Sequence, residues 1–384
     1  MTDVDYHPST HPPLPPTTED ERLSWLRLLR SRRVGIATFY RLLADHGTGS
    51  AALEALPEIA AEAGVTNYEP FPEKAALAEL RAGRKAGAQL ICLGASAYPA
   101  ALLDADDPPP MLWIHGDPAV LARPMIGMVG ARNASSLGLR MARVMAGELA
   151  EAGFVVVSGL ARGIDAAAHR GAVGTGTVAV MAGGTDVLYP AENADLAADI
   201  AKTGVRLSEM PMGQQPQARH FPRRNRIISA LGQALVVVEA AARSGSLITA
   251  RTALDQGREV LAVPGHPFDA RASGCNMLNR DGAGLVRSAA DVIEALPTST
   301  PAKVLQCEFD LPASPPADQR AFRETARLHS EILNRLSPVP LAEDQLIRDL
   351  SRDSTRVSPA ITRLELLGRI RRHAGGLLAR AGGD

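Results

Sequence analysis

The stretch Met125–Ser136, MIGMVGARNASS, joins a short apolar run to a glycine, an arginine and a group of helix-starting residues. An apolar run that ends in glycine and leads into a helix is typical of a parallel strand followed by its crossover helix. Further apolar runs follow at intervals of roughly 25–30 residues, the length of one strand, one helix and two loops. They are Phe154–Val157, Val178–Met181, Val205–Leu207, Leu235–Val238 and Val260–Val263.

Apolar residues at three- and four-residue spacing fill most gaps between these runs, for example in Leu139–Leu149 and Ile164–Val173. Strands that are apolar on both faces belong in a parallel sheet that helices cover on both sides. Two earlier runs, Leu90–Leu93 and Met111–His115, predict additional strands at the edge of that sheet. Residues 88–296 are therefore predicted to form an α/β domain with an extended, Rossmann-like, doubly wound and mostly parallel sheet.

The flanking residues differ in composition from this domain. Residues 1–18 are rich in proline and predict a disordered tail, whereas residues 19–87 show helical spacing interrupted by glycines and predict a small helical domain. Residues 297–319 are again proline-rich and predict a linker. Residues 320–384 show three helical patterns and a hairpin, the outline of a winged helix.

Two local signals define the predicted winged helix. Ser358-Pro359 is a favourable N-cap and first-turn pair, so the third helix is predicted to begin there and to cover Ala360–Leu367. The second helix is predicted at Leu341–Leu350. Gly375-Gly376 resembles a two-residue hairpin turn.

Composition limits the classes of function. The 384 residues are 46% hydrophobic and 22% charged, which supports sizeable cores. With 41 basic and 42 acidic residues the net charge is −1, so contact with nucleic acid must come from a local basic patch. Cys92, Cys275 and Cys307 are too scattered for a disulfide framework. The N-terminus lacks an apolar leader pattern and no run approaches about 18 apolar residues, which predicts a cytoplasmic protein without membrane contact.

Small residues follow four of the predicted strands, at the edge where carboxyl ends meet. The loops contain Gly130 and Arg132, Ser158–Asp165, Gly183–Asp186 and Ser244–Thr249. Backbone N–H groups and helix N-termini in such loops bind anions, and an arginine adds a bidentate phosphate contact. The spacing matches neither G-x-G-x-x-G nor G-x-x-x-x-G-K-S/T. Four such loops favour a polyanion over one compact ligand, although the glycines alone could serve only tight turns.

The most basic window is Arg219–Arg226, with four arginines interrupted by Phe221. Arginines next to an aromatic ring suit a phosphate backbone with a stacked base. The alternative is a solvated helix start whose arginines pair with nearby carboxylates.

Patterns of catalytic residues are missing from the sequence. It contains no G-x-S-x-G, H-E-x-x-H or H-x-E…C-x-x-C motif. Asp165 is interpreted as a helix cap and His169 as a packed histidine. No catalytic residue, metal site or cofactor is therefore predicted.

The central domain closely resembles the DNA-processing protein A family (DprA, also called Smf), over more than half of the chain and in the same order. The motifs that carry the resemblance are Tyr98-Pro99, Pro110…Trp113…Gly116, Val129-Gly130-x-Arg132, Ser158-Gly159-x-Ala161-x-Gly163-Ile164-Asp165, His169, Gly183…Tyr189-Pro190…Asn193, Phe221-Pro222-x-Arg224-Asn225-Arg226-Ile227-Ile228, Glu239, Ser244–Thr249, Pro264-Gly265 and Gly274-x-Asn276-x-Leu278-Asn279…Gly282-Ala283. The flanks resemble the family's SAM-like, helix-hairpin-helix-related domain and its winged-helix tail.

The resemblance implies a non-enzymatic, dimeric protein of natural transformation and DNA recombination. Such proteins bind and protect incoming single-stranded DNA, help to load RecA recombinase and displace single-strand-binding protein. They form homodimers through the Rossmann-like domain.

Carried onto this chain, the resemblance implies a set of single-stranded-DNA-binding residues in which arginine takes the place of lysine. They are Gly130, Arg132, Ser158, Gly159, Arg162, Gly163, Phe221, Arg223, Arg224, Asn225, Arg226, Ser244, Gly245 and Ser246.

Two other functions stay open. Gly183-Gly184-Thr185-Asp186 and Glu239 partly echo a nucleotide phosphoribohydrolase. Thr362, Arg363, Arg369, Arg371 and Arg372 could make the tail a winged-helix regulator of duplex DNA, and a protein-binding winged helix fits them equally.

Overall fold

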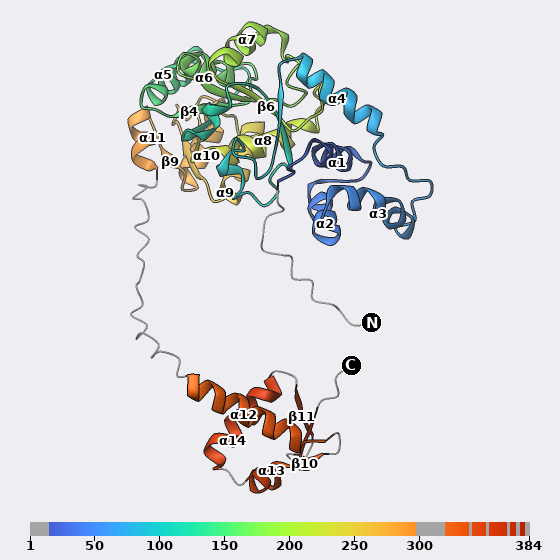
Figure 1. Ribbon diagram of the computed structural model, residues 1–384. Coiled ribbons are helices and arrows are strands. Elements are labelled where there is room, and N and C mark those ends of the chain that lie inside the picture. Colours follow the sequence, from blue (N-terminus) through green and yellow to red (C-terminus); the bar gives the residue numbers. More distant parts are fainter. Residues whose placement is uncertain are drawn as a thin grey trace. The chain divides into compact units, whose positions relative to one another are not determined.

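A computed structural model of the protein describes residues 15–296, 319–337, 340–350, 353–366, 369–373 and 377–380. The chain separates into two compact units, Met1–Pro297 and Thr298–Asp384 (Figure 1). Most of the predicted tail and linker and the predicted turn Gly375-Gly376 lie outside the described residues.

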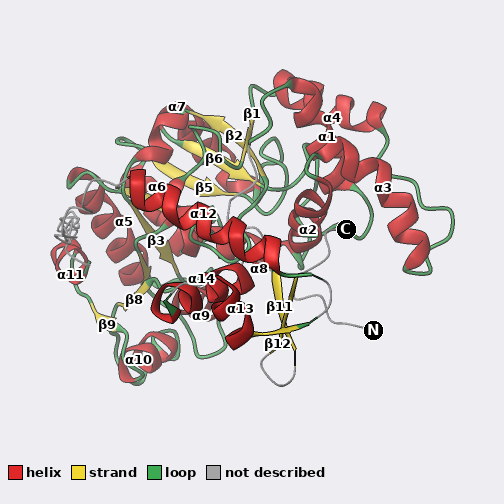
Figure 2. Ribbon diagram, turned by 60° about the horizontal axis from the view of Figure 1, so that its bottom comes forward, coloured by secondary structure: helices red, strands yellow, loops and turns green. Residues whose placement is uncertain are grey.

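The first unit contains a nine-stranded sheet in the order β1-β2-β6-β5-β4-β3-β7-β8-β9. The strands are β1 Gln89–Cys92, β2 Met111–Gly116, β3 Met125–Val129, β4 Val155–Ser158, β5 Thr177–Val180, β6 Val205–Ser208, β7 Ala234–Val237, β8 Glu259–Ala262 and β9 Gly284–Leu285. Strands β3 to β9 pair in parallel, whereas β1 and β2 pair antiparallel at one edge (Figure 2). The predicted edge strands are confirmed.

Helices cover both faces of this sheet. The elements on one face are α5 Ser136–Glu151, α6 Ile164–Ala172, α7 Ala194–Thr203 and α11 Ala289–Ala295, and those on the other are α8 His220–Leu231, α9 Gly245–Asp255 and α10 Ser273–Arg280. Successive residues of β4 supply opposite layers, since Val156 packs on the α5–α6 side and Val157 on the α8–α9 side. The structure therefore confirms the predicted doubly wound sheet (Figure 1).

The order of the strands creates a crevice next to β3. The chain builds β4, β5 and β6 outward from one side of β3 and then returns to place β7 on its other side. The loops after β3 and β7 consequently lead away in opposite directions, and ligands of open α/β sheets bind at such a switch point.

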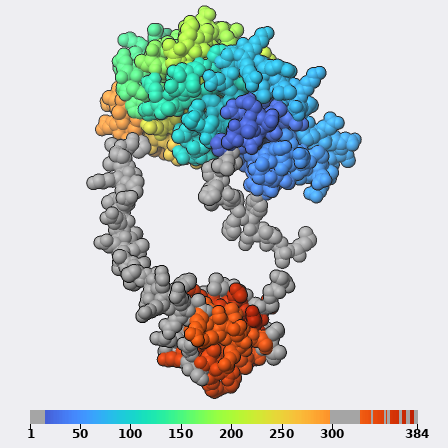
Figure 3. Space-filling model, viewed as in Figure 1, coloured from blue at the N-terminus to red at the C-terminus, as the bar shows by residue number. Residues whose placement is uncertain are grey.

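Four helices precede the sheet within the first unit, and they form its blue part in Figure 3. They are α1 Glu19–Arg30, α2 Ile36–His46, α3 Gly49–Glu62 and α4 Glu73–Lys85. Thr18 begins α1 with a capping box to Glu21. Trp25 and Phe39 pack edge to face at 5.2 Å inside the helical part, whose core continues into that of the sheet.

A buried polar cluster joins these helices to the sheet. The Arg30 guanidinium donates to both Glu79 carboxylate oxygens, at 3.1 and 2.9 Å, and the Trp113 indole donates to Glu79 at 2.9 Å. Because α4 passes so close to Trp113, a Cβ at Gly83 would overlap the indole ring. The three side chains thereby bind α1 and α4 to β2.

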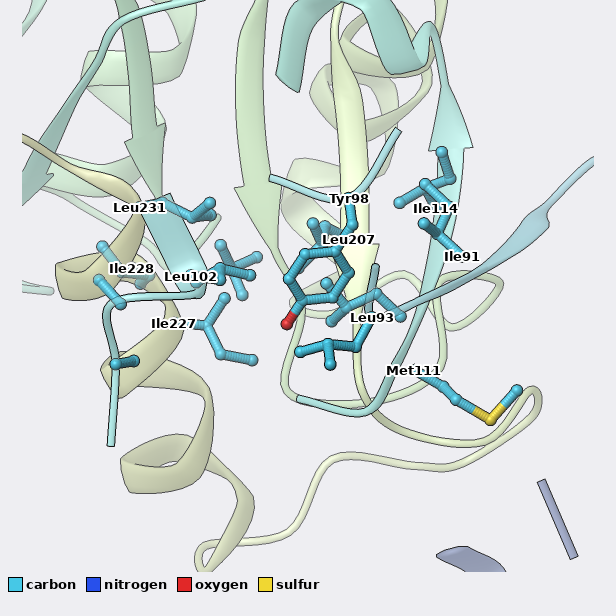
Figure 4. Packing of buried hydrophobic residues seen from close by; sticks show 14 of the residues in the cluster. Ile91, Leu93, Tyr98, Leu102, Met111, Ile114, Leu207, Ile227, Ile228 and Leu231 are labelled. Atoms are coloured by element: carbon cyan, nitrogen blue, oxygen red, sulfur yellow. The ribbon is translucent and has the colours of Figure 1, made fainter. Parts of the chain in front are cut away.

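A tyrosine hydroxyl is buried in the core below α8. Figure 4 shows Tyr98 among Leu102, Leu207, Ile227 and Leu231, and all five side chains are buried. The Tyr98 hydroxyl donates to the carbonyl of Pro109 at 2.8 Å. Burial raises the pKa of Tyr98, so this hydroxyl stays protonated at neutral pH.

The second unit is a winged helix. It contains α12 Gln319–Arg335, β10 Leu341–Ala342, α13 Glu343–Leu350, α14 Ser354–Leu366, β11 Ile370–His373 and β12 Leu377–Arg380, with strand order β10-β12-β11. The predicted second helix starts too early, because Leu341–Ala342 pairs with β12.

The start predicted for the third helix was wrong. Helix α14 begins at Ser354, and Pro359 lies inside it. Val357, Ile361 and Leu364 are buried at the spacing of one helical face, so packing extends the helix beyond the capping signal at Ser358-Pro359. Pro359 lies on the exposed side, and Gly368 falls outside the described residues.

Candidate nucleic-acid interface

A groove of about 800 Å³ occupies the crevice between the carboxyl ends of β3 and β7, and we call it the switch-point groove. The loop after β3 contributes Gly130 and Arg132, and the loop after β7 contributes Arg243 and Ser244. Helix α8 forms one wall. Four arginines line the groove, namely Arg132, Arg224, Arg243 and Arg271, against one carboxylate, Asp165. The groove thus has the positive charge that a polyanion requires.

The Phe221 ring lies close to two of these guanidinium groups. The Cζ atoms of Arg132 and Arg224 lie 5.1 and 5.9 Å from the centre of its ring. The ring of Tyr189 lies 6.2 Å from that of Phe221. Tyr189, Phe221, Gly159, Arg162 and Gly183 line a second, smaller cavity, the aromatic hollow. Cations over an aromatic face and open ring surface are the groups that contact unpaired bases and their phosphates.

Arg224 is buried at the base of both cavities. Its Nη1 donates to the carbonyl of Val180 at 2.9 Å, which fixes the side chain below the loop after β4. Burial lowers the pKa of Arg224 to about 10, while the negative charge of Asp165 opposes that change. The guanidinium therefore remains charged at neutral pH.

Asp165 and His169 are buried residues of α6, and the charge of Arg224 on α8 affects the pKa of both. Burial raises the pKa of Asp165, and the charge of Arg224 works against the rise. Burial, together with Arg224, lowers the pKa of His169 to about 3, so this imidazole is neutral. His169 Nδ1 lies 2.9 Å from the Thr177 hydroxyl, and the side chain is fully buried.

Two glycines leave space for the close approach of Arg224 and of the loop after β3. A Cβ at Gly159 would overlap the Arg224 guanidinium. Gly163 has a φ of 78° at the start of α6, and a Cβ there would strike the carbonyl of Ala131. A larger residue would displace the Arg224 side chain at the first position and the loop after β3 at the second.

The N-terminus of α5 does not contribute the anion contact that the sequence suggests. The Glu239 carboxylate accepts hydrogen bonds from the Ser135 backbone N–H at 2.9 Å and from the Ser135 hydroxyl at 2.6 Å. An internal carboxylate thereby occupies the anion position of this helix. The guanidinium groups are left as the main phosphate-binding groups of the groove.

Most of the predicted site residues come together. Gly130, Arg132, Phe221, Arg224, Asn225, Ser244, Gly245 and Ser246 line the switch-point groove. Gly159 and Arg162 line the aromatic hollow. Gly163 lines a third cavity, which also touches Arg132 and Arg162.

The structure does not bring Ser158, Arg223 or Arg226 to any of these three cavities. The Ser158 hydroxyl is buried and donates to the carbonyl of Met128 at 2.6 Å, which ties β4 to β3. Arg226 forms an ion pair with Glu209 at 2.5 Å, and Arg223 pairs with the same carboxylate at 3.4 Å. Pairing with carboxylates, the alternative reading of the basic window, therefore holds for these two arginines.

Sequence reasoning missed three residues of the site. Arg243 directly precedes Ser244, so its place in the loop after β7 was available as a signal. Arg271 follows β8 without a recognisable motif, and its charge is partly offset by Asp269 at 3.0 Å. Tyr189 is half-exposed beside Phe221 but is distant from it in sequence.

The side chains of the described residues bear on three other kinds of site, namely metal, membrane and catalytic sites. No group of three or more metal-ligating side chains is found among them. None of the described helices has the length and apolarity to cross a membrane. Glu239, the carboxylate of the predicted hydrolase alternative, is bound to Ser135 and nearly buried, which disfavours a catalytic role.

Family models match all three parts of the chain. The model of DNA recombination-mediator protein A matches residues 89–297. A DprA-like N-terminal HHH domain matches residues 19–82, and the DprA winged helix domain matches residues 312–376.

Individual relatives agree with these matches. The chain is 43% identical to DNA processing protein DprA of Bacillus subtilis over 221 residues, 57% of this chain and 74% of the relative. It is 35% identical to protein Smf of Escherichia coli over 314 residues, which cover 80% of this chain and 81% of the relative.

Solved structures show the same likeness. DNA processing protein A of Streptococcus pneumoniae superimposes with a TM-score of 0.58 at 31% identity, over 72% of this chain and 93% of that one. The protein of Helicobacter pylori, described for its single-stranded DNA binding mode, gives a TM-score of 0.50 at 29% identity, over 54% of this chain and 95% of that one. The chain belongs to the DprA/Smf family of DNA-processing proteins.

Proposed function

We propose that this protein binds single-stranded DNA in the switch-point groove with little dependence on base sequence. The observation that carries the proposal is Phe221 flanked by Arg132 and Arg224 on the wall of an arginine-lined groove. Guanidinium groups neutralise phosphates of any sequence, and aromatic side chains stack bases of any kind that are free of a duplex. The single-stranded DNA binding mode of the Helicobacter pylori relative supports this assignment.

The test is a fluorescence-anisotropy titration of the intact protein with a labelled single strand of about 50 nucleotides and the matching duplex, across a salt series. We expect tight, salt-sensitive binding that prefers the single strand. Equal binding of both, or binding of neither, would rule the proposal out.

Arg132→Ala locates the site within that experiment. Loss of a charged phosphate contact is expected to weaken single-strand binding by about tenfold or more and to reduce the slope of log K against log salt by roughly 0.7. Arg81→Ala is the matched control, since Arg81 is an exposed arginine on α4. If Arg132→Ala and Arg81→Ala behave alike, the phosphate site lies elsewhere.

In the cell, we propose that the protein protects incoming single strands during natural transformation, acts in the cytoplasm and helps RecA recombinase to replace single-strand-binding protein. The family membership supports this role. The measurement is RecA filament assembly on strands coated with single-strand-binding protein, with and without this protein. The proposal excludes a catalytic function, and release of free base from a nucleoside monophosphate would contradict it.

We further propose a homodimer that forms through the later part of the sheet unit. Ile248, Leu254, Met277 and Leu285 are exposed apolar side chains on α9, α10 and the edge strand β9. An exposed strand edge beside apolar side chains is a surface that proteins normally cover. Light scattering should give the mass of two chains, and that of one chain would contradict the assignment.

A further inference from the structure

A third cavity, of about 360 Å³, adjoins the switch-point groove on the α5–α6 side, and we call it the basic hollow. Arg132, Arg162 and Arg170 line it, together with Glu192 and Asn193. Arg132 also lines the switch-point groove and the aromatic hollow. The Arg132 side chain therefore lines all three cavities.

The basic hollow has more positively than negatively charged side chains. Arg162 Nε lies 3.6 Å from Glu192, and both side chains are more than half exposed, so their pairing is weak. Arg170 is exposed in the last turn of α6 and has no ion pair within the described part of the chain. Three guanidinium groups thus face one carboxylate.

The floor of the basic hollow is held in place. The Asn193 amide donates to the carbonyls of Leu160 and Ala161, at 3.0 and 3.3 Å, and so fixes the loop that carries Arg162. Gly163 brings this loop against the carbonyl of Ala131, next to Arg132. Arg132 and Arg162 consequently project from loops with defined positions, which lowers the entropic cost of binding a phosphate.

We propose that a single strand bound in the switch-point groove continues past Arg132 into the basic hollow, where Arg170 contacts the backbone phosphate of an additional nucleotide. This inference rests on the proposed function and extends it, because it assigns the path of the strand beyond Arg132. The ligand of the basic hollow is the sugar-phosphate backbone, so its occupation depends on the length of the strand and not on its bases.

A structural role for Arg170 makes a different prediction. A cation in the last turn of a helix is stabilising near its C-terminus whether or not DNA is bound. Loss of that contribution would alter the stability of the fold. It would change the affinity for short and long strands equally.

The experiment compares Arg170→Glu with the unsubstituted protein on oligothymidylates of about four and about 20 nucleotides, which lie at the lower end of and beyond the usual range of single-strand site sizes. For the longer strand we expect affinity to fall about tenfold and the salt slope to decrease by roughly 0.7. Affinity for the shorter strand should stay within about twofold, because a strand of this length can occupy the switch-point groove without continuing past Arg132. Arg170→Lys should restore most of the lost affinity.

Arg81→Glu is the matched control, since it makes the same charge change on α4, far from α5 and α6 in Figure 1. Arg170→Ala is the milder second variant, and thermal unfolding verifies that each variant is folded. Unchanged binding of the longer strand by Arg170→Glu overturns the inference alone, and so does an equal loss for both lengths. If the unsubstituted protein binds neither strand, the proposed function fails and the inference fails with it.

Discussion

Phe221 lies close to both Arg132 and Arg224, and these two arginines differ in environment. Arg132 is exposed and can follow a phosphate, whereas Arg224 is buried and bonded to the carbonyl of Val180. The buried guanidinium is fixed beside the ring, whereas the exposed one is accessible to a ligand. A base in a duplex cannot reach the ring, because its faces are already stacked, and this explains a preference for single strands.

His169 is expected to make the fold sensitive to acid. Its pKa is near 3 in the folded protein and about 6.5 when unfolded. The unfolded chain therefore binds an extra proton below pH 6.5, and the stability present above that pH is lost as the pH falls towards 3. Between pH 6.5 and 5 the loss is about 2 kcal/mol.

Urea unfolding of the wild type and of His169→Asn at pH 7 and pH 5 measures this effect. The wild type should lose about 2 kcal/mol more than the variant, which has no titrating group at this position. Parallel losses in both proteins would show that His169 does not cause the pH dependence.

Sequence could predict which residues line the groove better than it could predict their contacts. The loops at the carboxyl ends of parallel strands were enough to bring Gly130, Arg132 and Ser244 together. The bond from Ser135 to Glu239 spans 104 positions, and spacing cannot show that this carboxylate closes the start of α5. Ser158 is the last residue of β4 and directly precedes Gly159, yet its hydroxyl donates to a carbonyl within the sheet.

Helix α8 carries three arginines with three different environments. Arg223 is exposed, Arg224 is buried at the groove, and Arg226 is largely buried against Glu209 and Asp107. From the sequence they form one basic window. Two structural facts distinguish the arginine that lines the groove from those that pair with a carboxylate. They are the direction of each side chain from the helix and the position of Glu209 directly after β6.

Arg226→Ala is expected to destabilise the fold by about 3–5 kcal/mol, because it leaves the Glu209 carboxylate buried without its closest partner. Single-strand affinity should fall as well, since α8 also carries Phe221 and Arg224. Urea unfolding and anisotropy measure the two effects.

Arg223→Ala is the matched control for that substitution. It removes an arginine from the same helix and the same carboxylate, but its side chain is 55% exposed. The expected loss of stability is below about 1 kcal/mol. Equal losses for the two variants would refute a supporting role for Arg226.

The switch-point groove, the aromatic hollow and the basic hollow all belong to the first of the two units. Deletion of residues 320–384 should therefore change single-strand affinity by less than about threefold. Loss of a contact worth about 1.4 kcal/mol would change it about tenfold. The comparison uses the same anisotropy titration. A loss of tenfold or more would place part of the binding site in the winged helix.

In the winged helix, the predicted DNA-contacting arginines are not all available. Arg372 of β11 pairs with Glu343 at 2.8 Å and with Glu365 at 3.2 Å. Its charge is thus partly neutralised on the surface of this unit, which weakens the case for a duplex-binding regulator. Sequence identified the winged-helix pattern, but ion pairs between α13, α14 and β11 depend on packing that periodicity does not show.

The cluster of Arg30, Glu79 and Trp113 affects the tryptophan fluorescence of the protein. The chain contains two tryptophans, and both Trp25 and Trp113 are buried in the first unit. Trp113 gives its indole N–H to Glu79 on α4, so its surroundings change as soon as that helix moves away from the sheet. Emission from an indole shifts to longer wavelength when water reaches it. The native fluorescence of the protein therefore records, without any added dye, whether the N-terminal helices remain attached to the sheet.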